Sequence, residues 1–457
     1  MRRRRFIPAA GSIRRRKRVA SDSPESKALW AEPVPPEASP PPLNPLQNMK
    51  TSPPTGRANL SALGIAVAIS ACAISACFLW ARNVQEARLH SAAPEFCDAK
   101  LHGVALIREA FSRPDTLVFL GSSELIPTVP MRGVEFFAEA PTGFSMFPVG
   151  KAGTTALSVL QKLGGAGETL RGKKVVLSLS PSFFQNEQVD AKYFAGNSSK
   201  LQTKEFLWNS SYSKELRQTA AQNLLRYPQA YEGDWILEFT LRRMAGTEQA
   251  DRVLLALIAP LASLDRAVCR LQDHVEASLA LLNASEDDQV PDAAPLSTGK
   301  SSMINWDELL KKAEAQSKAL AARTARKPFK AIRDQGTGDS QFLSKLKNAE
   351  EWKHFELVLR LIKEAGAEPL VMSMPLHVDV LEAQGVSADA RSYFGKQLRG
   401  LTKKYGVPLV YFEKHENDPV FFVDQFDHIG SKGWWYYNKA LDDFYHNRLG
   451  PGSVAAL

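Results

Sequence analysis

Residues 118–127 read VFLGSSELIP, an apolar run that closes in Gly-Ser-Ser-Glu. A short Gly/Ser cluster after a strand is most often a polar turn. A serine at the end of a strand can also act as a nucleophile, provided that a base and oxyanion donors lie near it. The remainder of the chain decides between a turn and a catalytic serine.

The apolar runs of the chain have the length and composition of buried strands. Four of them are apolar on both faces and bounded by Gly, Pro or Ser, at 116–121, 173–180, 367–375 and 406–413. Helical spacing appears at 352–367 and 390–406, and both segments end near glycine. The alternation predicts an α/β fold, a three-layer sandwich around a parallel sheet. Ligands bind at the carboxyl ends of such strands, which is where Gly-Ser-Ser-Glu begins.

The net positive charge is confined to the first 57 residues. This segment holds 12 Arg and Lys against 4 Asp and Glu, which accounts for the whole net charge of +8. The other 400 residues carry 45 basic and 45 acidic groups, so no nucleic-acid partner is expected for the main domain. The tail, 1–57, is Arg-rich and then Pro-rich, and this composition predicts disorder.

Residues 58–81, ANLSALGIAVAISACAISACFLWA, contain no charged side chain. A helix of this length covers about 30 Å of hydrocarbon, which predicts a single transmembrane anchor. The Arg clusters precede the span, so the tail is expected in the cytoplasm and everything after Arg82 outside it. The predicted location is therefore the inner or plasma membrane, with an extracytoplasmic main domain.

The predicted domain organisation follows from these segments. A juxtamembrane helical segment covers 82–114, the catalytic domain covers 115–450 and a short tail covers 451–457. Within the domain, about 185–345 is predicted to be a large helical insertion, because it contains long amphipathic and Ala/Lys-rich runs. The insertion covers the sheet, shapes a substrate cleft or faces a membrane partner.

Cysteine spacing gives no sign of a metal site. Cys72 and Cys77 lie in the span, and only Cys97 and Cys269 lie beyond it. An oxidising compartment would permit these two to pair, although nothing in the sequence shows that they meet. There is no Cys-x-x-Cys pair and no phosphate-cradling Gly-rich loop. Neither a metal nor a cofactor is expected.

His428 differs in context from the other seven histidines. It lies in FFVDQFDHIGSKGWWYY, after the last predicted strand and before a helix predicted to start near Ser431. An activated serine needs a base, and the base needs a carboxylate that orients it. Asp424 and Asp427 both stand close to His428 in the sequence.

Read together, the two ends of the domain resemble the SGNH (GDSL-like) hydrolases, in which a Gly-x-Ser turn opens the domain and a histidine closes it. The resemblance is closer to the DltD family, on the strength of FLGSSEL and of DHIGSKGWWYYNKALDDFY. It covers about residues 58–447, loosely through the insertion. DltD proteins carry one N-terminal membrane helix and an external catalytic domain, in agreement with the anchor predicted from charge and hydropathy.

The resemblance implies residue roles. Ser123 becomes the nucleophile, and its backbone NH or that of Ser122 becomes one oxyanion donor. The family's second glycine lies after the next strand and corresponds to Gly150, or alternatively to Gly153. Gln425 stands three residues before His428, where SGNH enzymes have an aspartate.

The orienting carboxylate is therefore Asp424 or, alternatively, Asp427. Asp424 is preferred because adjacent side chains on an extended loop tend to point apart. A second departure from the SGNH pattern follows the strand at 173–180. Pro181-Ser182-Phe183-Phe184 replaces the Gly-x-Asn-Asp block there. Its loss favours acyl transfer on a specialised substrate over general esterase activity.

The activity implied by the resemblance is D-alanylation of a cell-envelope polymer, lipoteichoic acid or a related polysaccharide or glycolipid. The implied partners are an MBOAT-type membrane acyltransferase and an acyl carrier protein system. Candidate substrate contacts are Ser122, Glu124, which could bind an aminoacyl ammonium, and His377 in MPLHVD. Two alternatives stay open: an O-acetyltransferase or esterase acting on an exopolysaccharide, and a non-catalytic scaffold for the membrane acyltransferase.

Overall fold

The computed structural model describes residues 56–284, 304–323, 338–376, 378–424, 428–450 and 452–455. Two of the predicted site residues, His377 and Asp427, lie outside the described residues, as does most of the predicted N-terminal tail. The chain divides into two compact units, 1–65 and 66–457.

A parallel sheet forms the centre of the larger unit. Its strands lie in the order β2-β1-β3-β4-β5-β6, and every pair of neighbours is parallel. The strands are β1 (Thr116–Leu120), β2 (Ser145–Val149), β3 (Lys174–Leu179), β4 (Glu368–Ser373), β5 (Leu409–Tyr411) and the two-residue edge strand β6 (Val454–Ala455). The predicted α/β class and parallel sheet are confirmed.

Two strands were absent from the four apolar runs: β2, and β6, which lies within the predicted tail 451–457. β2 is the edge strand beside β1, and it contains Pro148. Proline lacks the NH that a strand ladder needs, so the pattern argued against a strand here. An edge position tolerates it, because only one side of the strand must be paired. The resemblance had nevertheless placed a strand just before Gly150.

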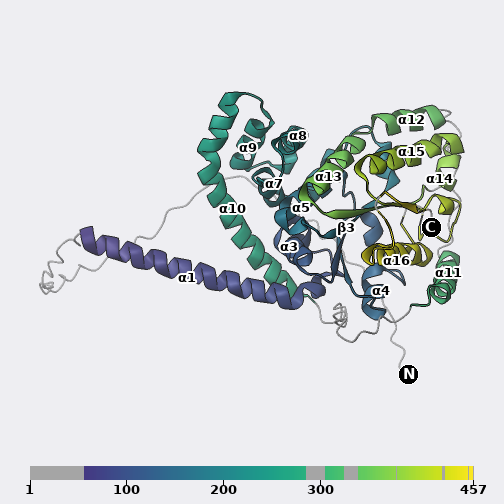
Figure 1. Cartoon of the computed structure of the whole chain (residues 1–457), viewed down its shortest axis with the longest axis horizontal. Coiled ribbons are helices and arrows are strands. Elements are labelled where there is room, and N and C mark those ends of the chain that lie inside the picture. Colours follow the sequence, from purple (N-terminus) through teal and green to yellow (C-terminus); the bar gives the residue numbers. More distant parts are fainter. Residues whose placement is uncertain are drawn as a thin grey trace, which may run out of the picture. The chain divides into compact units, whose positions relative to one another are not determined.

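Helices cover both faces of the sheet (Figure 1). On one face, Phe119 of β1 packs on Trp434 and Tyr437 of α16 (Ser431–Tyr445), with ring centroids 6.4 and 6.3 Å apart. The next residue, Leu120, points to the other face, toward α5 (Ala156–Ala166) and α13 (Glu351–Ala365). This alternation explains why β1 is buried at all five positions.

The two predicted crossover helices are confirmed. α13 ends at Gly366 and α15 (Ala388–Tyr405) ends at Gly406, and both glycines take the left-handed conformation that closes a helix. The predicted C-terminal helix begins at Ser431 as α16. The remaining helices outside the insertion are α2 (Asp98–His102), α3 (Ala105–Ser112), α4 (Gly133–Glu139) and α14 (Val378–Ala383).

The described residues between β3 and β4 form helices and no strand. They are α6 (Ala191–Asn197), α7 (Lys200–Leu207), α8 (Lys214–Leu224), α9 (Trp235–Ala245), α10 (Gln249–Asn283), α11 (Trp306–Arg323) and α12 (Gly338–Asn348), followed by α13. α10 is the longest, with 35 residues. Asp273 on α10 accepts hydrogen bonds from the NH groups of Val104 and Ala105, both at 2.8 Å, and so ties α10 to the start of α3.

α1 (Gly56–Arg88) is the one helix among the described residues that is long and apolar enough to cross a membrane. Its last turns pack on α10: the Gln85 amide donates to His274 O at 2.9 Å, and Ser278 Oγ donates to Ala81 O at 3.1 Å. All four cysteines are described and free, so Cys97 and Cys269 are not paired here.

Candidate functional site

The Gly-Ser-Ser-Glu segment turns directly out of β1. The Gly121 NH donates to Val149 O at 3.1 Å, which extends the pairing with β2 by one residue. Ser123–Leu125 then forms a single 3-10 turn, closed by the Ile126 NH on Ser123 O at 3.1 Å. Ser123 therefore lies at the carboxyl edge of the sheet, the position that the sequence predicted.

The two serines have different surroundings. Ser122 is 2% exposed, and its hydroxyl donates to Lys151 O at 3.3 Å. Ser123 is partly exposed, and within the described chain its hydroxyl makes no hydrogen bond. A nucleophile must reach its substrate, so the geometry favours Ser123 over Ser122.

Gly150 lies against the nucleophile turn. A Cβ at this position would stand 1.9 Å from Gly121 O, so only glycine lets the end of β2 approach so closely. The NH groups of Ser123 and Gly150 have no protein acceptor in the described part of the chain. Both are thus available to an oxyanion. Gly153, the alternative donor, packs instead on the ring of Tyr193, 2.6 Å from where its Cβ would lie.

Gly150→Ala is expected to disturb the turn and the stability of the fold together. The added methyl must displace the Gly121 carbonyl, at a cost of about 1–3 kcal/mol. The temperature of thermal unfolding and the rate at which a fluorophosphonate modifies Ser123 would both fall. Gly196→Ala, where a Cβ meets nothing within 4 Å, is the matched control. Equal behaviour of the two variants would contradict the close approach.

The Ser122 NH is not free for an oxyanion. It donates to Glu124 Oε2 at 3.0 Å, and Glu124 is fully buried. In this conformation the Ser122 NH is thus occupied, which leaves the NH groups of Ser123 and Gly150 as the predicted oxyanion donors. Their role stays a prediction. Glu124 Oε1 lies 2.5 Å from where a Gly121 Cβ would stand, so the carboxyl group supports the turn from inside. Its predicted contact with a substrate ammonium stays untested.

Glu124 also connects the turn to the histidine loop. Burial raises the pKa of Glu124, while the Ser178 hydroxyl, then the Ser122 amide and last the charge of His428 act in the opposite direction without overcoming it. Phe119 of β1 packs on Trp434 and Tyr437 of α16, the helix that begins three residues after His428. The two ends of the domain meet at this edge of the sheet.

Glu124→Gln is expected to change how stability depends on pH. The pKa of Glu124 in the folded protein lies above its usual value of 4.5. The stability that the protonated carboxyl group contributes to the fold is therefore fully present below pH 4.5, and it is lost as the pH rises through the pKa of the folded state. Glutamine does not titrate. As the pH is raised from about 4.5, the melting temperature of the wild type should therefore fall relative to that of the variant. Differential scanning calorimetry from pH 4 to 8 measures this.

Glu215→Gln, at an exposed position on α8, is the control and should show no such trend. A difference between Glu124→Gln and the wild type that stays constant over the whole pH range would contradict the raised pKa.

The histidine loop is closed by main-chain hydrogen bonds. The Val423 NH donates to His428 O at 2.8 Å, and the Gly430 NH donates to Phe421 O at 2.7 Å. Asp424 lies across this loop from His428, and Asp424 Oδ2 is 2.5 Å from His428 Nδ1. A carboxylate at this distance favours the tautomer with the proton on Nδ1, in which Nε2 is the basic nitrogen.

This loop explains the departure from Asp-x-x-His. Asp424 precedes His428 by four residues rather than three, and the closed loop still brings its carboxylate to the ring. The structure brings Asp424 and His428 together, and it shows no hydrogen bond between Ser123 and His428. Such contacts often tighten only when substrate binds.

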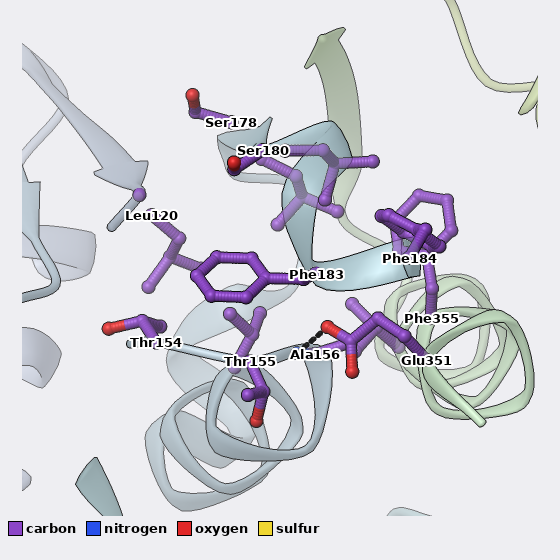
Figure 2. A pocket seen from close by; sticks show the side chains of 15 residues that line it. Leu120, Thr154, Thr155, Ala156, Ser178, Ser180, Phe183, Phe184, Glu351 and Phe355 are labelled. Carbon is purple, nitrogen blue, oxygen red and sulfur yellow. Dashed lines mark hydrogen bonds between the residues drawn. The ribbon is translucent and has the colours of Figure 1, made fainter. Parts of the chain in front are cut away.

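A small cavity of about 20 Å³ lies beside the turn, at the ends of β1 and β3. In Figure 2, Phe183 lies between Leu120 and the loop that carries Thr154 and Thr155. The segment after β3, where the SGNH pattern places an amide donor, therefore presents an apolar ring. Within the described residues, no group of three or more His, Cys, Asp or Glu is placed to hold a metal ion.

Sequence reasoning missed the supporting role of Glu124. The spacing Ser-x-Glu, with the glutamate two residues after a strand-end serine, is the signal that could have found it. A carboxylate in this position can accept the NH of the residue two before it.

Comparison with known proteins places the chain in a family. The family model described as "DltD protein" matches residues 93–446. Protein DltD of Bacillus subtilis is 25% identical over 373 residues, which cover 79% of this chain and 90% of that protein. Protein DltD of Staphylococcus aureus is 22% identical over 360 residues, 75% of this chain and 84% of that protein. The match spans both the nucleophile turn and the histidine loop, and the chain belongs to the DltD family.

Proposed function

We propose that the protein is a membrane-anchored serine acyltransferase that takes part in D-alanylation of a teichoic acid or a related envelope polymer. The observation that carries the catalytic part is the 2.5 Å contact between Asp424 and His428 on a loop next to the nucleophile turn. The identity of the acyl group as D-alanyl and of the acceptor as an envelope polymer is inferred from membership of the DltD family. The fold supports an SGNH-like reading, with the nucleophile after the first strand and the base before the last helix.

In the proposed reaction, His428 Nε2 takes the hydroxyl proton while Ser123 Oγ attacks the carbonyl carbon of the acyl donor. The NH groups of Ser123 and Gly150 stabilise the tetrahedral oxyanion, on the order of 3 kcal/mol for each donor. Collapse expels the donor's leaving group, which takes the proton from His428. A hydroxyl of the polymer then repeats these steps on the acyl-serine, and Ser123 is regenerated with its proton.

The proposed topology places this chemistry outside the cytoplasm. α1 supplies the span, and the Arg-rich segment before it favours a cytoplasmic N-terminus. A cysteine introduced after Arg88 should react with a membrane-impermeant maleimide in intact cells. Labelling only after cell lysis would refute this orientation.

A membrane acyltransferase of the MBOAT type is the proposed partner, fed by an acyl carrier protein system. An exposed apolar stripe on α10 supports a protein contact near the anchor, because the end of α10 packs on α1. The stripe consists of Val253, Leu257, Leu261, Leu264, Val268, Leu279 and Leu282, each at least 40% exposed. Leu257→Glu with Leu264→Glu should abolish co-purification of that enzyme; unchanged recovery would remove this surface from the proposal.

The product identifies the function most directly. A strain that lacks this chain should lose D-alanine esters from its envelope polymer and regain them when the chain is restored. Mild alkaline release followed by chiral chromatography measures the ester. Loss of acetate instead of D-alanine would replace the proposal with the O-acetyltransferase or esterase alternative.

A further inference from the structure

A second cluster of charged side chains lies between α3, α5, α7 and α10. It lines a cavity of about 370 Å³. Its charged lining residues are Arg108, Glu168, Glu205, Arg266 and Arg270. The cavity borders Gly167–Leu170, the segment that leads into β3, so it lies at the sheet edge opposite to Ser123.

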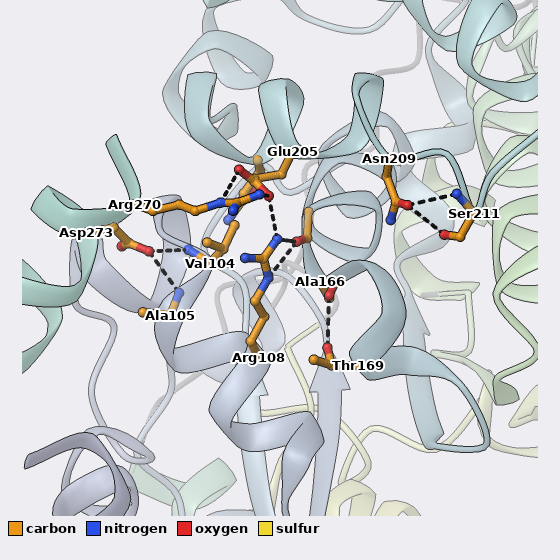
Figure 3. Close-up of polar contacts among 12 residues, drawn as sticks. Val104, Ala105, Arg108, Ala166, Thr169, Glu205, Asn209, Ser211, Arg270 and Asp273 are labelled. Atoms are coloured by element: carbon orange, nitrogen blue, oxygen red, sulfur yellow. Dashed lines mark hydrogen bonds and ion pairs between the residues drawn. The ribbon is translucent and has the colours of Figure 1, made fainter. Parts of the chain in front are cut away.

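The one buried carboxylate of this cavity is already shared by two arginines. The Glu205 side chain is 3% exposed, and it accepts from Arg270 Nε at 2.7 Å and from Arg108 Nη2 at 2.7 Å (Figure 3). Arg108 also donates twice to Gly165 O. These contacts fix two guanidinium groups at the wall of the cavity, and the Arg270 side chain stays 43% exposed.

Arg266 carries the third positive charge without a matching carboxylate contact. Its guanidinium lies 5.7 Å from the centre of the Trp208 ring, and Nη2 donates to Ser263 Oγ at 3.2 Å. Its Nε is buried and has no hydrogen-bond acceptor in the part of the chain that the structure describes. Because no carboxylate of the described chain pairs with this guanidinium, it is free to pair with an oxyanion, the partner that fits a guanidinium best.

The electrostatics of the neighbourhood agree. Burial lowers the pKa of Arg266; Glu205 opposes this, and the positive charges of Arg270 and Arg108 reinforce it. The pKa of His274 is also lowered, by burial and then by Arg108, Arg270 and Arg82. Asp265 also opposes the lowering of the Arg266 pKa. Among the residues that line the cavity, three arginines stand against Glu168 and Glu205, so the lining carries one more positive than negative charge.

A neutral donor completes the wall. Asn209 Oδ1 accepts from the Ser211 NH at 2.9 Å and from Ser211 Oγ at 2.7 Å, which fixes the orientation of the amide. Asn209 Nδ2 then faces Gly167, 3.0 Å from where a Cβ would stand. A side chain at position 167 would fill this space.

We propose that this cavity binds a phosphate group, held by Arg266, Arg270 and Asn209. Arginine forks match phosphate oxygens in pairs, and the amide supplies a further donor. The group can belong to a phosphodiester polymer, to a lipid headgroup or to free phosphate. Binding here does not require the chemistry at Ser123, so it can be measured without any acyl transfer.

The test is titration of the full chain, in detergent, with inorganic phosphate by isothermal calorimetry at two salt concentrations. We expect saturable binding that weakens as salt rises. Arg266→Ala should weaken it about tenfold or more, equivalent to losing one charge-assisted hydrogen bond. Arg266→Lys keeps the positive charge but loses the paired donors of the guanidinium. Its affinity for phosphate should therefore lie between those of the wild type and of Arg266→Ala. Arg252→Ala, exposed on the same helix, should bind as the wild type does.

Two further ligands distinguish the source of the phosphate. Tighter binding of a poly(glycerol phosphate) oligomer than of phosphate points to a polymer, and Arg266-dependent flotation with phosphatidylglycerol vesicles, but not with phosphatidylcholine vesicles, points to lipid. Binding of inorganic phosphate, with neither tighter binding of the oligomer nor flotation with phosphatidylglycerol vesicles, points to a free ion. No binding by the wild type, or equal binding by folded Arg266→Ala and Arg266→Lys, would overturn the proposal.

Discussion

Ser123→Ala will reduce D-alanylation of the envelope polymer by at least about a thousandfold, because it removes the hydroxyl that is proposed to form the acyl bond. Oγ of Ser123 is the partly exposed hydroxyl beside two free NH donors. Alanine removes one oxygen and leaves the turn intact, so the variant should melt within a few degrees of the wild type. The ester content of a complemented deletion strain measures the loss.

Ser122→Ala is the matched control. Its hydroxyl is buried and donates to the Lys151 carbonyl, so its removal should cost little activity. Full D-alanylation by both Ser123→Ala and His428→Ala would instead support the scaffold alternative, in which another protein performs the transfer. Loss with Ser122→Ala alone would move the nucleophile by one residue.

Asp424→Asn will lower the rate of acyl transfer about 10²- to 10⁴-fold while leaving the fold in place. Asparagine can present its amide NH to His428 Nδ1, which favours the tautomer with the proton on Nε2. That tautomer cannot accept the serine proton. Stopped-time labelling of Ser123 by a fluorophosphonate measures the rate without any polymer substrate.

Asp427→Asn is the companion variant, because Asp427 is the alternative orienting residue. It should keep most of the activity. A larger loss with Asp427→Asn than with Asp424→Asn would show that the 2.5 Å contact of Asp424 with His428 is not the one that matters in catalysis.

The central sheet was predictable because its main strands are buried on both faces and therefore read as continuous apolar runs. β2 was harder, since an edge strand with Pro148 lacks that signature. Helix ends at Gly366 and Gly406 were marked by residues that suit the left-handed conformation. These are local signals, and sequence shows them directly.

Sequence patterns can nominate the serine and the histidine of the candidate site, but they indicate less about the groups that would support them. Spacing could not choose between Asp424 and Asp427, because the choice depends on how the loop folds back on itself. The supporting groups depend on packing between segments far apart in sequence. This holds for the burial of Glu124 and for the cavity that brings Arg108 together with Arg266 and Arg270. Such contacts leave no periodic pattern in the chain.

Mass spectrometry of the full chain after reaction with a fluorophosphonate tests the central claim most directly. The proposed mechanism predicts one adduct, on Ser123, formed by the wild type and by Ser122→Ala and absent from Ser123→Ala and His428→Ala. No adduct on the folded wild-type chain, or an adduct on Ser122, would contradict it.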